Sequence, residues 1–384
     1  MSTRSSDRAA DPRPTRALID LAALAANWAI ARRHAGERAV IAVVKADAYG
    51  HGAPAVARRL LREGCTAFAV ATASEVAALR AAGIDAKVLL LGGVDDAAAA
   101  RTALALGATP VLHHEAMRVA VEDAAASLGR RASVHVEVDT GMRRLGVPAG
   151  EAADLIARVA ASRHLALEGV STHFARADER DPAPTRAQVE ALARVLEDVR
   201  RRGVEPGQLH LANSAGLLGT ATWQDLLPGD AVRPGVMLYG VTPAPHFAGV
   251  GLRAVMTLQT AVTALRRVAA GEGVGYGAVW RAPRSGWIAT LPMGYADGMP
   301  WSLGRPVPYA GGTVLIAGRQ RAIVGRISMD LTTVWLEDDA VALGERAIVF
   351  GAGAPVEALA AAADTTAYEL LVRVGDRVPR LAID

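Results

Sequence analysis

The stretch AVIAVVKA, residues 39–46, is a short run of apolar and β-branched residues with the pattern of a buried strand. Seven similar runs follow it before residue 241, separated by segments rich in Ala, Leu and Arg that have helical spacing. They are TAFAVAT (66–72), KVLLLG (87–92), TPVLH (109–113), SVHVEVD (133–139), LEGVSTHF (167–174), QLHLANS (208–214) and VRPGVMLYG (232–240). Eight alternating strand and helix units predict a (β/α)8 TIM barrel, which takes about 250 residues.

The pattern changes after residue 245. Gly, Pro, Val and Thr become more frequent, and short strands separated by turns replace the long helical segments, which is typical of a mainly β domain. We therefore predict a disordered polar tail at 1–16, a barrel at 17–245 and a C-terminal β domain at 246–384. Asp20 is a candidate N-cap for a helix ahead of the first barrel strand, and a strand before it could join either domain.

Composition indicates an ordinary soluble chain. It has 384 residues, 51% of them hydrophobic, and a formal charge of +3 without a dense basic run, so a nucleic-acid partner is not expected. Cys65 is the only cysteine, which excludes an intrachain disulfide and a thiolate metal site and is typical of a reducing compartment. The N-terminus lacks the apolar core of a signal peptide, and no run is long enough to cross a membrane, so we expect a cytoplasmic protein.

Lysine is rare in this chain. Of 42 basic residues only Lys45 and Lys87 are lysines, and Lys45 stands inside the first apolar run. A desolvated lysine can lose its proton and condense with an aldehyde, as the lysine that anchors pyridoxal phosphate does, whereas arginine stays protonated. The simpler alternative is a lysine that reaches the barrel rim or pairs with Asp47.

Other polar residues fall at the same rim, because catalytic groups of such barrels gather where the strands end. For a phosphate, hydroxyl and backbone donors are expected at Ser214, Gly235 and Tyr49. Arg233 could meet a pyridine nitrogen and keep it unprotonated. Each has a simpler interpretation: Ser214 could be a helix N-cap, Arg233 a partner for a carboxylate, and His173 a hydrogen-bonded core histidine.

Taken together, the chain resembles alanine racemase, a fold-type III pyridoxal-phosphate enzyme with a barrel and a C-terminal β domain. The most specific match is AVVKADAYGHG (42–52), which is similar to the family's cofactor-lysine signature. The segments VDTGM.RLG, THFA.ADE, ANSA, RPG..LYG, GVGYGA, GYADG and GRISMD then follow in the family's order. The resemblance runs from about residue 17 to the end.

The resemblance implies two catalytic residues, Lys45 on one face of the substrate α-carbon and Tyr276 of the second subunit of a homodimer on the other. Two groups on opposite faces are the economical solution for racemisation, since one face loses a proton and the other gains one. The cofactor-binding residues implied are Lys45, Tyr49, Arg144, His173, Asn213, Ser214, Arg233, Gly235 and Val236. The substrate-binding residues implied are Arg144, Tyr295, Met329 and Asp330, and the role implied is supply of D-alanine for peptidoglycan.

Three positions depart from the family pattern. Glu137 stands where many members have a lysine that becomes carbamylated and braces the arginine, so we hypothesise activity that is independent of bicarbonate. Ser328 replaces a frequent cysteine, which should blunt inactivation by thiol reagents. Asp376 replaces a phosphate-binding tyrosine of some members and receives no role, because an acid would repel a phosphate.

Alternative functions stay open at this stage. They are a racemase of other or several small amino acids such as serine, a fold-type III decarboxylase, a non-catalytic pyridoxal-phosphate carrier and a Schiff-base aldolase. The carrier and the aldolase need neither Tyr276 nor a second domain. Broad-specificity racemases usually carry a secretion signal and a disulfide, which are not found here.

Overall fold

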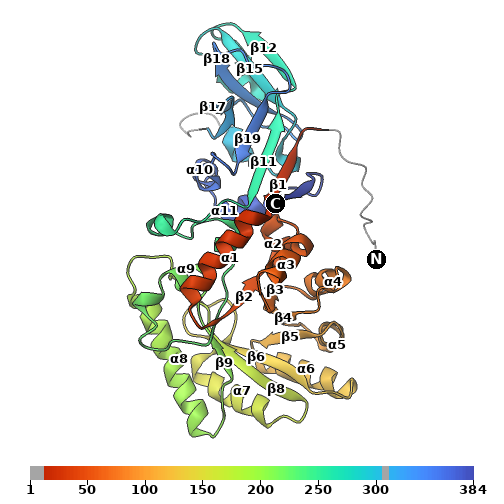
Figure 1. Cartoon of the computed structure of the whole chain (residues 1–384), viewed down its shortest axis with the longest axis vertical. Coiled ribbons are helices and arrows are strands. Elements are labelled where there is room, and N and C mark those ends of the chain that lie inside the picture. Colours follow the sequence, from red (N-terminus) through yellow and green to blue (C-terminus); the bar gives the residue numbers. More distant parts are fainter. Residues whose placement is uncertain (1–12, 305–310) are drawn as a thin grey trace. The chain divides into compact units, whose positions relative to one another are not determined.

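The computed structural model describes residues 13–304 and 311–384, and the chain divides into two compact units (Figure 1). One unit comprises residues 24–48 and 52–253, and the other comprises the residues before 24, residues 49–51 and residues 254–384. The sequence predicts a disordered tail at residues 1–16. The part at residues 1–12 lies outside the described residues. Each unit is described by itself below.

The first unit is a closed parallel barrel, which confirms the predicted fold. Its eight strands follow one another around the barrel, and β5 pairs with β6 to close it. They are β2 (Ala39–Val43), β3 (Ala67–Val70), β4 (Lys87–Leu90), β5 (Ala108–Leu112), β6 (Ala132–Asp139), β8 (Leu165–Ser171), β9 (Gln208–His210) and β10 (Ala231–Val232). A two-residue strand, β7 (Val147–Pro148), is added beside β6.

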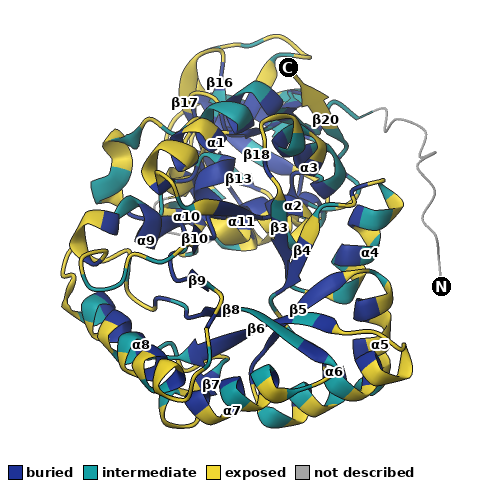
Figure 2. Cartoon of the chain, turned by 60° about the horizontal axis from the view of Figure 1, so that its bottom comes forward, coloured by how far each residue is buried: buried dark blue, intermediate teal, exposed yellow. Residues whose placement is uncertain are grey.

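Helices surround the barrel and bury one face against it, as Figure 2 shows by their dark inner and yellow outer sides. They are α1 (Leu21–Ala35), α3 (Ala53–Arg62), α4 (Ala73–Ala81), α5 (Ala97–Ala105), α6 (Glu115–Ser127), α7 (Ala149–Ala161) and α8 (Ala183–Arg201). Short-range sequence signals start several of them. Asp20 Oδ1 accepts a hydrogen bond from the Ala23 amide at 2.6 Å, as predicted, and Thr72 and Glu75 form a capping box on α4.

The first and the eighth barrel strands are shorter than the sequence predicts. The first ends at Val43 rather than at residue 46, because the chain turns into the short helix α2 (Lys45–Gly50). The eighth ends at Val232 rather than at residue 240, and the helical turns of η2 (Val236–Tyr239) replace its second half. Pro234 has no N–H to offer a neighbouring strand, which is consistent with this early end.

The second unit is built on a nine-stranded, mainly antiparallel sheet. In sheet order its strands are β12 (Ala264–Val268), β15 (Gly286–Leu291), β18 (Thr332–Glu337), β17 (Arg319–Val324), β16 (Thr313–Ile316), β19 (Arg346–Phe350), β11 (Met256–Ala261), β1 (Arg16–Asp20) and β20 (Arg380–Ile383). The strand ahead of the first barrel strand, β1, thus belongs to this sheet. A small ribbon, β13 (Gly273–Val274) with β14 (Trp280–Arg281), and the helices α10 (Val356–Ala362) and α11 (Ala367–Arg373) complete the unit.

Candidate active site

Lys45 is the first residue of a left-handed helical turn. Ala46, Asp47, Ala48 and Tyr49 all have positive φ, between 51° and 55°. This conformation costs roughly 1–2 kcal/mol per residue for L-amino acids and clusters at functional sites when surrounding bonds hold it. The turn therefore places Lys45 at the barrel rim at a cost in backbone free energy.

Hydrogen bonds of the barrel unit hold this turn. Glu75 Oε1 accepts from the Ala46 amide at 2.6 Å, and Asp47 Oδ1 accepts from the Ala53 amide at 2.6 Å. The alternative in which Asp47 pairs with Lys45 is not supported, because the structure gives Lys45 no ion pair among the residues it describes. The Asp47 carboxylate fixes the chain that leaves the turn instead.

The Lys45 amine is half-buried, and its pKa is lowered. Desolvation is the main cause, and the positive charges of Arg144 and Arg233 add to it, whereas Glu75 and Glu137 act in the opposite direction. A lowered pKa raises the fraction of neutral amine, which is the form that attacks an aldehyde or removes a proton.

Arg233 follows β10 and is 4% exposed. Its guanidinium donates to the Thr172 carbonyl at 2.7 Å and to Nδ1 of His210 at 2.6 Å. Among the described residues no carboxylate is hydrogen-bonded to it, but the Glu137 carboxyl interacts with its charge, so the predicted alternative role as a carboxylate partner stays open. Burial lowers the pKa of Arg233 to about 10, which keeps it protonated at neutral pH. Arg233 is thus a buried, oriented cation that offers donors only.

His173 lies just beyond β8. Burial first, then the charges of Arg233, Arg144 and Lys45, lower the pKa of His173 to about 3, so the imidazole is neutral. Its Nε2 lies 3.5 Å from Nδ2 of Asn213. This neutral, largely buried imidazole beside Asn213 is compatible both with a site role and with the simpler interpretation as a hydrogen-bonded core histidine.

Ser214 joins two helical N-termini. It is the first residue of α9 (Ser214–Leu218), and the N-cap is Asn213, whose Oδ1 accepts from the Gly216 amide at 2.9 Å. Ser214 Oγ accepts from the Gly235 amide at 2.9 Å and from the Met237 amide at 3.3 Å. Because both lone pairs of the hydroxyl are taken, its proton is left to donate outward, as an anion site requires.

Glu137 and Arg144 lie at the end of β6 and in the loop after it. Glu137 is 8% exposed; burial raises the pKa of its carboxyl, and Arg233, Arg144 and Lys45 lower it. Asp139 Oδ1 accepts from the amides of Gly141 and Arg143, which shapes the turn that carries Arg144. Burial thus disfavours the charged form of the Glu137 carboxyl, and the charges of Arg233, Arg144 and Lys45 favour it.

Tyr49 belongs to α2 but groups with the second unit. Its ring lies 6.4 Å from that of Tyr368 of α11, and burial raises the pKa of its phenol. The phenol therefore stays protonated at neutral pH and can act as a hydrogen-bond donor.

The remaining predicted residues lie on the surface of the second unit. Tyr276 opens the turn η4 (Tyr276–Ala278) and is 71% exposed, and Tyr295 and Met329 are also exposed. The Tyr295 amide donates to the Ser328 carbonyl at 3.0 Å, which brings Tyr295 and Met329 together. Asp330 is held by Arg377 at 2.8 Å.

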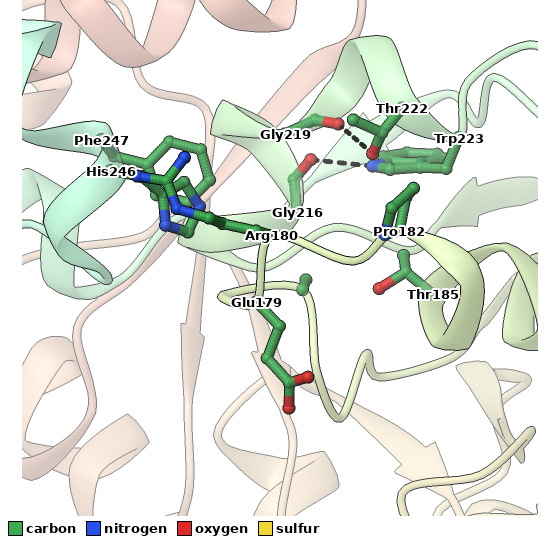
Figure 3. Close-up of a pocket in the computed structure, with 11 residues that line it drawn as sticks. Glu179, Arg180, Pro182, Thr185, Gly216, Gly219, Thr222, Trp223, His246 and Phe247 are labelled. Carbon is green, nitrogen blue, oxygen red and sulfur yellow. Dashed lines mark hydrogen bonds between the residues drawn. The ribbon is translucent and has the colours of Figure 1, made fainter.

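A separate pocket of about 170 Å³ opens in the barrel unit beside α9 (Figure 3). Gly216, Gly219 and Trp223 line one side of it, and Arg180, His246 and Phe247 line another. None of the residues predicted for the site lines this pocket. It is therefore not the candidate active site.

Comparison with known proteins matches both units to one family. The family model for the alanine racemase N-terminal domain matches residues 19–243, and that for the C-terminal domain matches residues 255–382. The chain belongs to the alanine racemase family. It is an amino-acid racemase, an isomerase that acts on alanine.

Individual relatives cover nearly the whole racemase chain. An alanine racemase of Azoarcus sp. is 43% identical over 365 residues, which is 94% of this chain and 97% of the relative. The crystal structure of alanine racemase from Streptomyces lavendulae has a TM-score of 0.89 at 35% identity and covers 97% of this chain and 98% of its own. That from Bartonella henselae, described with covalently bound pyridoxal phosphate, has a TM-score of 0.86 at 30% identity over 97% and 100%.

Two histidines that form hydrogen bonds behind Arg233 in the racemase barrel were not identified from the sequence. His210 binds Arg233 and His135 binds His210, yet neither histidine was selected as a site residue. The only signal was a single histidine in each of the predicted strand segments SVHVEVD and QLHLANS. No helix in the described part of the chain is long and apolar enough to cross a membrane.

Proposed function

We propose that the racemase uses pyridoxal phosphate, attached to Lys45, to interconvert L-alanine and D-alanine by proton transfer at two opposite faces of the α-carbon. The observation that carries this proposal is the Lys45 amine, half-buried beside Arg144 and Arg233, with a lowered pKa. Bound pyridoxal phosphate supplies an electron-accepting ring that stabilises the negative charge left on the α-carbon when its proton is removed.

The donors present at the rim fit this group. The Ser214 hydroxyl, with both lone pairs occupied by the Gly235 and Met237 amides, offers its proton, and the Val236 amide lies at the first residue of η2, where a phosphate is favoured. Gly235 would contribute by orienting this hydroxyl. Tyr49 adds a protonated phenol. These four residues would hold the phosphate.

The ring of the cofactor would lie between cations and neutral donors. Arg233 keeps its proton at neutral pH, so it would donate a hydrogen bond to the pyridine nitrogen without transferring the proton, and would leave that nitrogen unprotonated. His173 and Asn213, whose side chains lie 3.5 Å apart, would flank this position, and Arg144 would contact the phenolic oxygen and the substrate carboxylate.

Proton transfer needs two groups. Lys45, in its neutral form, removes the α-proton on one face, and Tyr276 of the partner subunit donates a proton on the other; the reverse reaction exchanges these roles. The high exposure of Tyr276 supports a role toward a second copy. The end of the site that holds the substrate would be lined by three residues of the partner subunit, namely Tyr295, Met329 and Asp330.

Complementation between two inactive variants tests the shared site. We expect Lys45→Ala and Tyr276→Phe each to abolish racemisation, because each removes one of the two groups. Mixed dimers have one site with both defects and one intact site, so unfolding and reassembling an equal mixture should restore about a quarter of the parental activity. No recovery, with dimers shown by ultracentrifugation, would place both residues in one chain.

Cofactor and substrate are tested on the parental protein. The purified chain should be yellow, and borohydride should change its absorbance and fix the cofactor on Lys45. A panel of L-amino acids in deuterated water, followed by α-proton exchange and D-isomer formation, separates strict alanine use from use of serine as well. Loss of carbon dioxide instead of inversion would indicate a decarboxylase.

For the biological role we propose supply of D-alanine for peptidoglycan by a cytoplasmic homodimer, without nucleic acid or membrane partners. Restored growth without D-alanine of a bacterium that lacks its own racemases would support this role. Growth on D-alanine as carbon source as the only phenotype would support degradation instead.

A further inference from the structure

A continuous line of polar side chains crosses the barrel interior behind Arg233. Nη1 of Arg233 lies 2.6 Å from Nδ1 of His210, and Nε2 of His210 lies 2.8 Å from Nδ1 of His135. Nε2 of His135 lies 3.9 Å from Oε2 of Glu168, which binds Nζ of Lys87 at 2.5 Å. Both histidines are completely buried, whereas Glu168 and Lys87 are partly exposed. The line thus joins the active-site arginine to a surface ion pair.

Hydrogen-bond chemistry fixes which atom donates and which atom accepts at each contact along this line. Arginine only donates, so Nδ1 of His210 must be the unprotonated acceptor and Nε2 must carry the proton. The proton on Nε2 then points at Nδ1 of His135, which must also be unprotonated. Hence His135 carries its proton on Nε2, the atom that faces the Glu168 carboxylate.

The two histidines stay neutral in this arrangement. Burial is the main cause that lowers the pKa of His135, to about 3, and of His210, and the charge of Arg233 lowers both further. Nε2 of His135 is buried without a hydrogen-bond partner among the described residues. At 3.9 Å the Glu168 carboxylate attracts this N–H electrostatically rather than through a direct hydrogen bond.

The barrel wall is shaped to hold the His135 ring. Gly169 pairs with His135 in the register of β6 and β8, and a Cβ at Gly169 would lie 2.4 Å from Nδ1 of His135 and 2.5 Å from the Gln208 carbonyl. Only glycine leaves room for the ring at this point.

We propose that His135 and Glu168 are positioning residues for racemisation: His135 holds His210 in the tautomer that accepts from Arg233, and Glu168 attracts the outer N–H of His135. The inference rests on the proposed role of Arg233 toward the cofactor ring. Without the acceptor on His135, His210 can move its proton to Nδ1, where it opposes the Arg233 N–H and displaces the guanidinium.

A matched pair of variants tests the histidine. In His135→Asn the amide oxygen takes the place of Nδ1 and still accepts, whereas His135→Leu has similar volume and no acceptor. We expect kcat to fall about 10- to 100-fold in the leucine variant and only about threefold in the asparagine variant, with KM changed less than kcat. Equal losses in both variants would mean that packing alone matters, and would overturn the proposal.

Histidine ¹⁵N chemical shifts of the full-length chain before cofactor is added provide a second readout. His210 should carry its proton on Nε2 in the parental and asparagine chains and shift toward Nδ1 in the leucine chain. A proton on Nδ1 of His210 in the parental chain overturns the proposal. This measurement needs neither cofactor nor substrate, so failure of the assigned cofactor chemistry would not alter it.

The carboxylate is tested by breaking the surface ion pair from each side. Glu168→Gln removes the charge that faces His135, and we expect kcat to fall about two- to fivefold. Lys87→Met breaks the same pair but leaves the carboxylate, so kcat should stay close to the parental value. Equal effects of the two variants would assign the ion pair to stability only and overturn the role of Glu168.

Discussion

Replacing Ala46 with glycine should stabilise the racemase, although glycine normally destabilises a helix. Ala46 is exposed and has φ of 51°, so its methyl group contributes little packing while its backbone stays in the left-handed region. Glycine adopts this region without the steric cost, and its amide can keep the hydrogen bond to Glu75.

The magnitude follows from two opposing effects. Relief of the left-handed conformation contributes roughly 1–2 kcal/mol, and the greater freedom of glycine in the unfolded chain costs about 0.5–1 kcal/mol. The net gain is about 0 to 1.5 kcal/mol with a centre of about 0.8 kcal/mol, and the central value raises the melting temperature of a barrel of this size by roughly 2–3 °C.

Ala187→Gly is the matched control. Ala187 is exposed in the interior of the right-handed helix α8, where glycine costs about 1 kcal/mol. The same substitution should therefore have opposite signs at the two positions in thermal unfolding followed by circular dichroism. If Ala46→Gly lowers the melting temperature as much as Ala187→Gly does, the strain assigned to the Lys45 turn is absent.

Three further predictions concern the site and the core. Because Glu137 already supplies a carboxyl group that interacts with the charge of Arg144, turnover should be the same with and without bicarbonate, and a carbamate mass on the purified chain would contradict this. His135 binds a proton in the folded chain only near pH 3 but in the unfolded chain near pH 6.5, so its contribution to stability is complete above pH 6.5. That contribution falls by about 1.4 kcal/mol per pH unit on acidification, and His135→Asn should flatten this dependence in denaturant titrations between pH 4 and pH 7. Cys65 is buried and its thiol has a pKa raised to about 11, and position 328 carries a serine without a thiol, so thiol reagents should leave turnover of the folded enzyme unchanged unless they also unfold it.

The barrel could be predicted because its eight strands are short apolar runs between helical segments, a pattern set by burial on both faces of a parallel sheet. The backbone conformation at the barrel rim could not be predicted from the sequence in this way. Lys-Ala-Asp-Ala contains no glycine, so nothing in its residue types indicates a left-handed turn at Ala46. That conformation depends on bonds from Glu75, whose position is known only once the strands are arranged.

The same limit applies to the site. Lys45 and Ser214 could be predicted because each carries its chemistry in one side chain. Lys45 is an amine in a chain whose other basic residues are nearly all arginines, and Ser214 is a hydroxyl at the end of a predicted strand. The contact between His135 and His210 depends on the stagger of strands 75 residues apart, which periodicity does not determine. His135 and His210, whose proposed role depends on their contact with each other, were therefore not predicted.

The position of β1 has a consequence for synthesis of the chain. This strand is made first, yet its neighbours in the sheet are β11 and β20, the latter at Arg380–Ile383. At about 5–20 residues per second, roughly 20–70 s separate the emergence of Asp20 from that of its last pairing partner, Ile383. β11 emerges earlier and can pair with one edge of β1, whereas the other edge stays open through the whole interval while the rest of the second unit is made.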